Sequence, residues 1–306
     1  MAWLLLAFMS AALLGCYDSL KKEALKSNAV IPVLFLNTLF SSFIFLPFIV
    51  LSDTTQLLDG SIFHVASGGW EVHRYIVLKA LIVLSSWILG YFGMKHLPLT
   101  IVGPINATRP VMVLVGALLV FGERLNGWQW MGVMLAVASF LLLSRSGKKE
   151  GIDFKHDHWI WMVVGSAALG AVSGLYDKYL MAPVAGGGVG LDRMLVQSWY
   201  NIYQCFMMLA MLVLLWWPTH HRTTPFHWHW SIIGVSIFLS TADFLYFYSL
   251  SLPDAMISIV SMVRRGSVVV SFLFGAAFFH EQNLKAKAFD LALVLLGMIF
   301  LYIGSE

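Results

Sequence analysis

The chain has 306 residues, of which 59% are apolar and 11% are charged, and its formal net charge is +3. A soluble domain carries about 25% charged residues because its surface faces water. A chain with less than half of that share cannot cover a soluble surface of this size, so the composition excludes a soluble globular domain. The net charge is small and no basic stripe accompanies it, so we expect no nucleic-acid partner.

Ten stretches of the chain are apolar enough to cross a bilayer as helices, which takes about 20 residues. In chain order they are Ala2–Leu20, Ala29–Leu51, Tyr75–His96, Leu99–Phe121, Trp128–Ser144, Trp159–Leu180, Met194–Trp217, Trp230–Leu250, Ala255–Phe279 and Ala286–Ile303. No basic segment precedes the first stretch, and Lys21 and Lys22 stand where a cleavage site would be, so we expect a retained helix. Lipid cannot satisfy the free edge of a strand. The predicted fold class is therefore an all-α membrane protein with ten transmembrane helices.

The longest polar break, between residues 144 and 158, falls at the midpoint and leaves five stretches on each side. Similar residues recur in the same order in both halves: Tyr17-Asp18 and Tyr176-Asp177, Asn37 and Asn201, Tyr91 and Tyr246, Arg109 and Arg264, and Glu123 and Glu281. Because five is odd, a second copy of the unit must cross the membrane in the opposite direction. The sequence thus predicts two inverted five-helix repeats, residues 1–150 and residues 151–306. Inverted repeats are common in secondary transporters, with the solute site near the midplane between them.

With this plan the sequence resembles the drug/metabolite transporter superfamily, EamA type. The resemblance spans nearly the whole chain and rests on Gly15 and Lys21 near the end of the first helix and on Gly122-Glu123-Arg124-Leu125 after the fourth. The second half departs from the pattern, because it lacks the lysine and has His280-Glu281 in place of Gly-Glu. The resemblance implies a carrier of metabolites, amino acids, sugar-nucleotides or phosphorylated solutes. It also implies a cavity formed mainly by the helices that come first, third, fourth, sixth, eighth and ninth in the chain.

Three arginines lie near the middle of predicted helices: Arg109 in the fourth, and Arg264 and Arg265 in the ninth. A charge at the bilayer centre costs about 2.5–3.5 kcal/mol on insertion scales, so such residues usually face a cavity or a partner. A guanidinium stays charged and binds carboxylate or phosphate through two parallel hydrogen bonds. One interpretation is that the arginines bind a negative group of the solute, and the other is that they pair only with internal carboxylates. Arg264 and Arg265 are also similar to a basic pair in the ninth helix of plant-type phosphate exchangers of the superfamily, which favours an anionic solute.

Other polar residues within the predicted helices are candidates for the same site. For solute binding they are Lys79, Tyr91, Tyr246, Asn37 and Asn201, and for proton coupling they are Asp18, Asp177 and Asp243. Asp18 and Asp177 stand in the last turns of their predicted helices, so the alternative is that they reach the lipid headgroups and take no part in coupling. The expected partners are a small-molecule solute and membrane lipid, with protons as a further candidate.

The remaining motifs favour structural interpretations. Glu123 and Glu281 lie beyond the apolar stretches, where we expect them to cap the following loops. The histidines between residues 220 and 229 have no cysteine or carboxylate at ligand spacing, so we expect no metal. No motif for a cofactor is present, and neither Gly-x-Ser-x-Gly nor HExxH occurs, so we expect no cofactor and no enzyme activity.

The sequence as a whole predicts a multi-pass protein of the cell membrane. We expect a secondary active transporter or exchanger that moves a small organic anion, bearing carboxylate or phosphate, by alternating access. The alternatives are a transporter of amino acids or other zwitterionic or amphipathic metabolites, a membrane enzyme, and a regulatory membrane protein. More lysines and arginines fall in the inner loops if both termini are outside, which the positive-inside rule favours. Members of the superfamily are usually described with both termini in the cytoplasm.

Overall fold

The computed structural model describes residues 2–112, 126–148, 156–181, 184, 187–222, 224–252, 260, 263–278 and 284–304. Within these ranges helix is the only regular secondary structure. The α-helices are α1 (Ala2–Leu25), α2 (Val30–Thr54), α3 (Trp70–His96), α4 (Leu99–Ala107), α6 (Gly127–Lys148), α7 (His158–Met181), α8 (Arg193–Met211), α9 (Ser231–Ser251), α11 (Ser267–Phe278) and α12 (Leu284–Ile303). Helix α8 continues into a π-helical turn, Leu212–Trp216, and a 3-10 turn, Trp217–Arg222.

Six helices in the described part of the chain are long and apolar enough to cross a membrane. They are Trp3–Leu25, Val30–Thr54, Trp70–His96, His158–Met181, Arg193–Arg222 and Ser231–Ser249. They coincide with six of the predicted stretches, and α4, α6, α11 and α12 fall within or over the other four. Residues 113–125 and most of 253–262 lie outside the described residues, as do Glu123 and Glu281. The result is an all-helical, multi-pass membrane protein in every part that the structure describes.

The first helix is longer than predicted, because its last turns are satisfied by protein. Helix α1 continues to Leu25. The ammonium of Lys22 donates to the carbonyl oxygens of Met94 at 2.7 Å and Leu97 at 2.5 Å, at the end of α3. Asp18 therefore lies about two turns before the end of α1, and its predicted place in the last turn is wrong.

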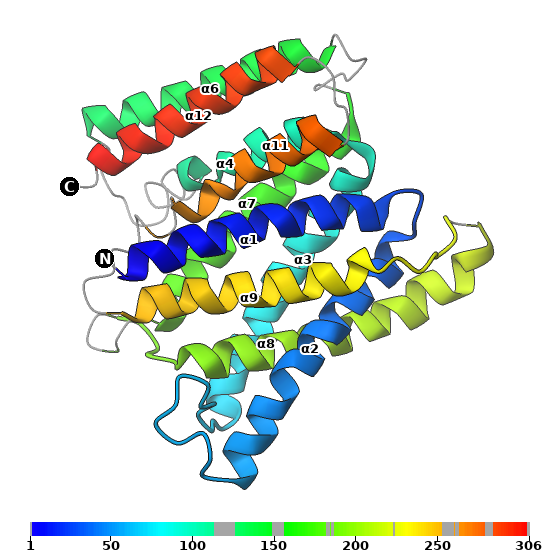
Figure 1. The fold of residues 1–306 in the computed structure, drawn as a ribbon, viewed down its shortest axis with the longest axis vertical. Helices are drawn as coiled ribbons and strands as arrows, with labels where there is room; N and C mark the ends of the chain where they lie inside the picture. Colours follow the sequence, from blue (N-terminus) through cyan, green and yellow to red (C-terminus); the bar gives the residue numbers. More distant parts are fainter. Residues whose placement is uncertain are drawn as a thin grey trace.

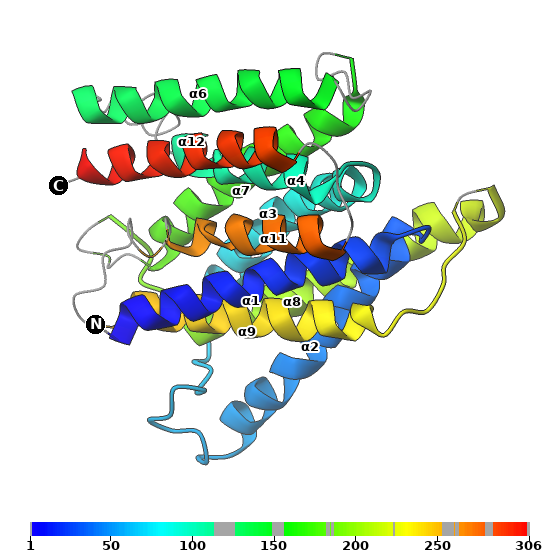
Figure 2. The ribbon, with the colours of Figure 1, turned by 45° about the horizontal axis from the view of Figure 1, so that its top comes forward.

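The helices pack as long side-by-side pairs (Figures 1 and 2). Helix α1 lies along α9, α3 along α7, α2 against α8, and α6 along α12. Helices α4 and α11 pack against each other between the α6–α12 pair and α1. The labelled N- and C-terminal ends lie on the same side of the molecule in both views.

Small and hydroxyl side chains hold these pairs together, as expected where lipid supplies no hydrophobic drive between helices. The hydroxyl of Ser10 donates to the carbonyl oxygen of Ala242 across α1 and α9, at 2.6 Å. The hydroxyl of Ser86 donates to the carbonyl oxygen of Ser166 across α3 and α7, at 2.8 Å. Both bonds use a backbone carbonyl of the neighbouring helix, so they fix the helices rather than a ligand.

Two apolar cores occupy opposite ends of the bundle. One joins the last turns of α1 and α3 to the first turns of α2, α4, α7 and α9. The other joins the first turns of α1, α3 and α8 to the last turns of α2, α7 and α9. Buried charge is not confined to the helices named from the sequence, because α12 also buries Lys287 and Asp290, with 0% and 2% of their surfaces exposed. The carbonyl oxygen of Asp290 accepts a hydrogen bond of 2.7 Å from Ser139 of α6.

Candidate functional site

Three ion pairs and two further arginines place eight charged side chains inside the bundle, in addition to Lys22 at the end of α1 and to Lys287 and Asp290 of α12. The eight are Asp18, Lys21, Lys79, Arg109, Asp177, Asp243, Arg264 and Arg265. Seven of the eight were singled out from the sequence as site candidates, and Lys21 was noted as part of the family motif. Six of them form three ion pairs, which the next paragraphs describe in turn.

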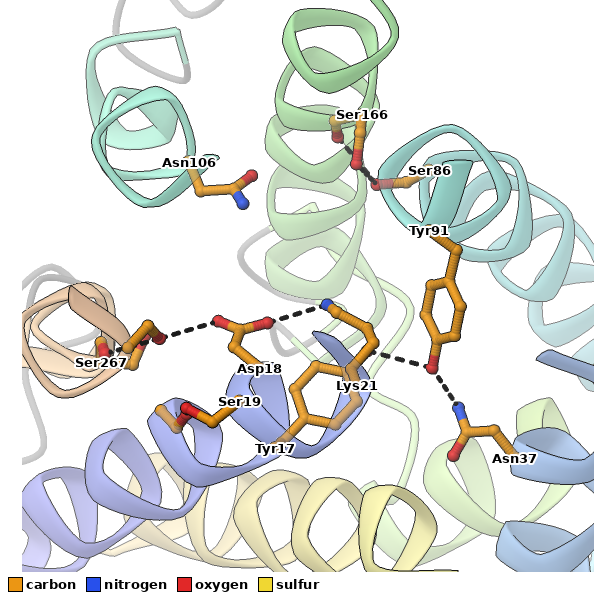
Figure 3. A network of polar contacts seen from close by, with 12 residues as sticks. Tyr17, Asp18, Ser19, Lys21, Asn37, Ser86, Tyr91, Asn106, Ser166 and Ser267 are labelled. Carbon is orange, nitrogen blue, oxygen red and sulfur yellow. Dashed lines mark hydrogen bonds and ion pairs between the residues drawn. The ribbon is translucent and has the colours of Figure 1, made fainter. Parts of the chain in front are cut away.

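The first ion pair lies within α1 (Figure 3). The Oδ1 atom of Asp18 is 2.8 Å from the Nζ atom of Lys21. Its Oδ2 atom accepts a hydrogen bond of 3.2 Å from the hydroxyl of Ser271, on α11. The carboxylate therefore joins α1 to α11 inside the protein, and the alternative that Asp18 reaches the lipid headgroups is wrong.

Two tyrosines and an asparagine adjoin this pair and connect three helices. The hydroxyl of Tyr17 donates to the hydroxyl of Tyr91 at 3.5 Å, and the Nδ2 atom of Asn37 donates to the same oxygen at 3.0 Å. The ammonium of Lys21 lies 4.3 Å from the ring centre of Tyr17 and 5.2 Å from that of Tyr91. A cation so placed over aromatic faces is held by electrostatic attraction. The structure thus brings predicted residues Tyr91 and Asn37 to one end of the charged group.

The second ion pair connects α3 to α7. The ammonium of Lys79 pairs with the carboxylate of Asp177, and their side chains are 3% and 15% exposed. The ammonium also lies 5.1 Å from the ring centre of Tyr200 and 5.8 Å from that of Phe247. Asp177 is therefore held inside the bundle, and the interpretation that it reaches the headgroups is wrong.

The third ion pair joins Arg264 to Asp243 of α9. The second carboxylate oxygen of Asp243 accepts a hydrogen bond of 2.9 Å from the hydroxyl of Tyr200. The guanidinium carbon of Arg264 lies 4.2 Å from the ring centre of Tyr246. One of the three predicted arginines is thus compensated by an internal carboxylate.

The other two arginines, Arg109 and Arg265, form no ion pair among the described residues. One terminal nitrogen of Arg109 donates to the side-chain oxygen of Asn106 at 3.1 Å, and its Nε atom is buried without a hydrogen-bond partner. The charges of Arg109, Arg264 and Asp18 all act on Arg265, and the charge of Asp18 acts on Arg109 as well. Two neighbouring guanidinium groups are therefore available to a negative ligand.

Helix geometry is interrupted next to both of these arginines. Thr108 forms a turn after α4, where its amide donates to the carbonyl of Ile105 at 3.2 Å, and Arg109 follows at once. Gly266 forms a turn before α11, where its amide donates to the carbonyl of Val263 at 2.9 Å, directly after Arg265. Discontinuous helices of this kind are typical of solute sites near the bilayer midplane.

Asn201 is the predicted site residue that the structure leaves apart from the charged group. The side-chain Nδ2 atom of Asn201 donates to the backbone carbonyl oxygen of Gln197 on the same helix at 2.8 Å. The backbone carbonyl oxygen of Asn201 accepts a hydrogen bond of 2.9 Å from the hydroxyl of Ser42 on α2. Sequence reasoning missed Tyr200, Ser271 and Asn106, which complete the shells around the carboxylates and Arg109. Only their positions within apolar helices set them apart in the sequence. Among the described residues no three His, Cys, Asp or Glu side chains lie together as metal ligands.

Residues 1–145 match the model of the EamA-like transporter family. That range contains the residues on which the resemblance rests, from Gly15 to Leu125. No curated protein matches the chain. A solved structure, described only as the crystal structure of a protein, is similar with a TM-score of 0.65 at 13% identity, over 99% of this chain and 97% of that chain. At that identity the likeness shows the fold alone, and it extends over both halves.

Proposed function

We propose that this chain, whose residues 1–145 match the EamA-like transporter family, is a membrane transporter of small molecules and that its solute is an organic anion. The solute carries carboxylate or phosphate, and the protein moves it across the cell membrane by secondary active transport or exchange. The conformational cycle is alternating access, in which the site opens to one side of the membrane at a time.

A surplus of buried positive charge is the observation that carries this proposal. The eight charged side chains comprise five cations and three carboxylates, and each carboxylate already has one cation. The surplus is Arg109 and Arg265, which lie near one another. An uncompensated charge within a membrane protein is costly, and such residues mark solute pathways. A carboxylate or phosphate supplies the missing charge and accepts the parallel hydrogen bonds that a guanidinium offers.

A zwitterionic solute is a poorer complement for the same residues. An amino acid brings no net charge, so it leaves the surplus of the site unchanged. Its ammonium group would also have to compete with Lys21 or Lys79 for a carboxylate that already forms an ion pair. An anion meets neither difficulty, and this favours it over the amino-acid alternative.

We assign the chain ten helices in two inverted repeats, residues 1–150 and 151–306, and the helix packing supports this assignment. In this assignment α1, α2, α3, α4 and α6 of the first half correspond to α7, α8, α9, α11 and α12 of the second. When each helix is replaced by its counterpart, the α1–α9 packing becomes α7–α3, the α2–α9 packing becomes α8–α3, and the α1–α11 packing becomes α7–α4. The pairs α2–α8, α4–α11 and α6–α12 each map onto themselves. All nine of these packings are present. These nine packings are what a two-fold repeat produces, whereas the packing of α4 against α12 has no mate of comparable extent between α11 and α6 in the described part of the chain.

One difference between the halves supports alternating access. Tyr17 and Tyr91 are tied by their hydroxyl groups, whereas their counterparts in the second half, Tyr176 and Tyr246, are not. Tyr176 donates instead to the carbonyl of Tyr75 at 3.3 Å. In an inverted repeat the two pairs belong to opposite faces of the membrane. A tyrosine contact that is formed on one face and absent on the other is the asymmetry expected of one state of a carrier, and the opposite arrangement is expected of its other state.

Counterflow of radiolabelled anions into proteoliposomes tests the proposal, after a panel of carboxylates and phosphate esters has been screened for thermal stabilisation of the purified protein. Arg109→Lys keeps the charge but loses the planar fork, so binding weakens, and Arg109→Ala and Arg265→Ala weaken it further. The matched control is Arg74→Ala, because the Arg74 side chain is 53% exposed at the start of α3. Normal anion counterflow in both alanine variants, at normal protein levels in the membrane, would overturn the proposal. Counterflow also separates a carrier from a membrane enzyme or a regulatory protein.

A further inference from the structure

A buried polar seam runs between α2, α8 and α9, beside the charged site and outside it. It is formed by the stretch from Asn37 to Ser42 on α2, the stretch from Gln197 to Gln204 on α8, and Ser236 and Ser240 on α9. Each of the four end residues on α2 and α8, and each of the two serines, is at most 6% exposed. Neutral polar side chains in membrane helices hydrogen-bond across the helix interfaces, so each of their groups should have a partner.

Hydrogen bonds across the seam fix the three helices in register. The hydroxyl of Ser42 donates to the carbonyl of Asn201 at 2.9 Å, which joins α2 to α8. The Nε2 atom of Gln197 donates to the carbonyl of Ser240 at 3.3 Å, and the hydroxyl of Ser240 donates to that of Ser41 at 3.2 Å. These hydrogen bonds do not satisfy every polar side-chain atom of the seam.

Five side-chain atoms of the seam are buried and have no hydrogen-bond partner in the protein. They are Oδ1 of Asn37, Oε1 of Gln197, Oγ of Ser198, and both Oε1 and Nε2 of Gln204. A buried polar atom without a partner is costly, and native structures pair nearly all of them with protein or ordered water. The seam is therefore built for a ligand.

The chemistry of these atoms identifies the ligand. None carries a charge, three are acceptors only, one is a donor only, and the Ser198 hydroxyl is both. The ligand must be neutral, must donate and accept, and must fit between packed helices. We propose that the seam holds a chain of internal water molecules that conducts protons between the two ends of the charged site. Internal waters typically bridge buried polar groups of this kind with two to four hydrogen bonds each.

The ends of the seam meet the charged site at two places. At one end, the Nδ2 atom of Asn37 donates to the Tyr91 hydroxyl at 3.0 Å. At the other end, Gln197 lies one turn before Tyr200, whose hydroxyl donates to Asp243 at 2.9 Å. A proton enters from solution at the Tyr91 end, and each water takes up one proton and releases another. The last water gives a proton to the Tyr200 hydroxyl as that hydroxyl gives its own to the Asp243 carboxylate, so only the carboxylate ends with one proton more.

Protonation of Asp243 has a defined consequence. The neutral carboxylic acid no longer compensates Arg264, so the guanidinium becomes available to the anion, and proton uptake is coupled to anion binding. The groups that act on Asp243 from neighbouring elements are Arg264, Tyr200, Tyr246, Tyr17 and Asp177. This coupling rests on the proposed function, whereas the water site rests on the seam alone.

Radiolytic hydroxyl-radical footprinting on the parent protein in detergent tests the water site. Met208, which is 0% exposed and one turn beyond Gln204, is the reporter; Met94, 1% exposed in the same apolar core but on α3, which carries no residue of the seam, is its matched control. Water activated inside the seam oxidises Met208 severalfold faster than Met94, and Gln204→Leu removes the difference. Equal protection of the two methionines in the parent protein would overturn the water site.

Proton movement is measured in proteoliposomes with an internal pH dye and an imposed potassium diffusion potential. Gln204→Leu and the smaller change Ser198→Ala slow acidification, while Ser85→Ala, an exposed serine bonded to its own helix, leaves it unchanged. Unchanged acidification in both seam variants, with Met208 protected in Gln204→Leu, would overturn proton conduction. Anion binding is scored separately on the same preparations. A hydrated, conducting seam without any anion binding would contradict the transport proposal alone, and anion binding with a dry seam would contradict this inference alone.

Discussion

Gly170 of α7 makes room for the Arg109 guanidinium, and a methyl group there displaces the arginine without removing its charge. A Cβ atom at residue 170 would lie 2.7 Å from both Cζ and Nη1 of Arg109 and 3.0 Å from Nε. Ordinary contact is 3.4–4 Å, so Gly170→Ala moves the guanidinium by roughly 1 Å or shifts α7. Gly174, one turn further along the same helix, has no atom within 4 Å of the corresponding Cβ position. Gly174→Ala is therefore a matched control for helix propensity and location.

The size of the effect follows from the hydrogen bonds of Arg109. A shift of that size stretches the 3.1 Å hydrogen bond from Arg109 to Asn106 beyond hydrogen-bonding distance. It also turns the parallel N–H donors of the Arg109 guanidinium away from the bound anion. A hydrogen bond from a charged group contributes about 1.5–3 kcal/mol. Since about 1.4 kcal/mol is a factor of ten in affinity, Gly170→Ala should weaken anion binding by roughly ten- to a hundred-fold, and Gly174→Ala should leave it within about two-fold.

Titration of the two purified variants with the anion selected by the stabilisation screen measures this difference directly. Thermal unfolding without ligand shows whether either variant is itself destabilised. Equal anion affinity in Gly170→Ala and Gly174→Ala, with both proteins folded, would show that the position of Arg109 does not matter for binding. In that case the argument from its uncompensated charge fails as well.

Three further outcomes are expected. Tyr91→Phe removes the hydroxyl contact to Tyr17 between α1 and α3, which contributes about 1 kcal/mol, so the populations of the closed and open distances between spin labels on the ends of α1 and α3 should change about five-fold relative to each other. Tyr246→Phe removes no such contact and should leave these populations unchanged, and an equal change in both variants would contradict alternating access. Asp177→Asn leaves the Lys79 ammonium buried alone and should lower the free energy of unfolding by about 3–5 kcal/mol, whereas exchange of both residues for apolar ones of similar volume should recover most of that loss in thermal unfolding. A tag on the N-terminus should be reached by antibody on intact cells, as the positive-inside count predicts, and reactivity only after permeabilisation would reverse that orientation.

Composition and hydropathy predicted the membrane class and the approximate helix positions, because both depend on the solvent that each stretch must face. Helix ends were predicted less well. The carbonyl groups at the end of α3 bind the Lys22 ammonium, and hydropathy assigns that lysine to a loop. A charged residue marks the end of an apolar stretch in the sequence. In the structure the helix continues through that residue where another part of the protein binds its charge.

The charged members of the site were predictable because each is an exception within an apolar helix. Their pairing was not. Lys79 and Asp177 are 98 positions apart in the chain, and no local pattern relates them. The sequence left internal pairing and solute contact as rival interpretations for all three arginines together. The structure divides them, because Arg264 has Asp243 while Arg109 and Arg265 have no carboxylate among the described residues.

That division follows from a break in the repeat. Arg109 and Arg264 are counterparts 155 positions apart (264 − 109), and the same offset relates Tyr91 to Tyr246. Carried back by 155 positions, Asp243 corresponds to residue 88, which is an isoleucine (Ile88). The first half therefore repeats the arginine but not the carboxylate that compensates it. Loss of Arg264 strands a buried carboxylate and acts mainly on stability, whereas loss of Arg109 strands no carboxylate and acts mainly on the solute. A repeated fold thus provides two equivalent places for a charge, and one unrepeated aspartate is enough to pair one of them inside the protein while the other stays without a carboxylate of its own.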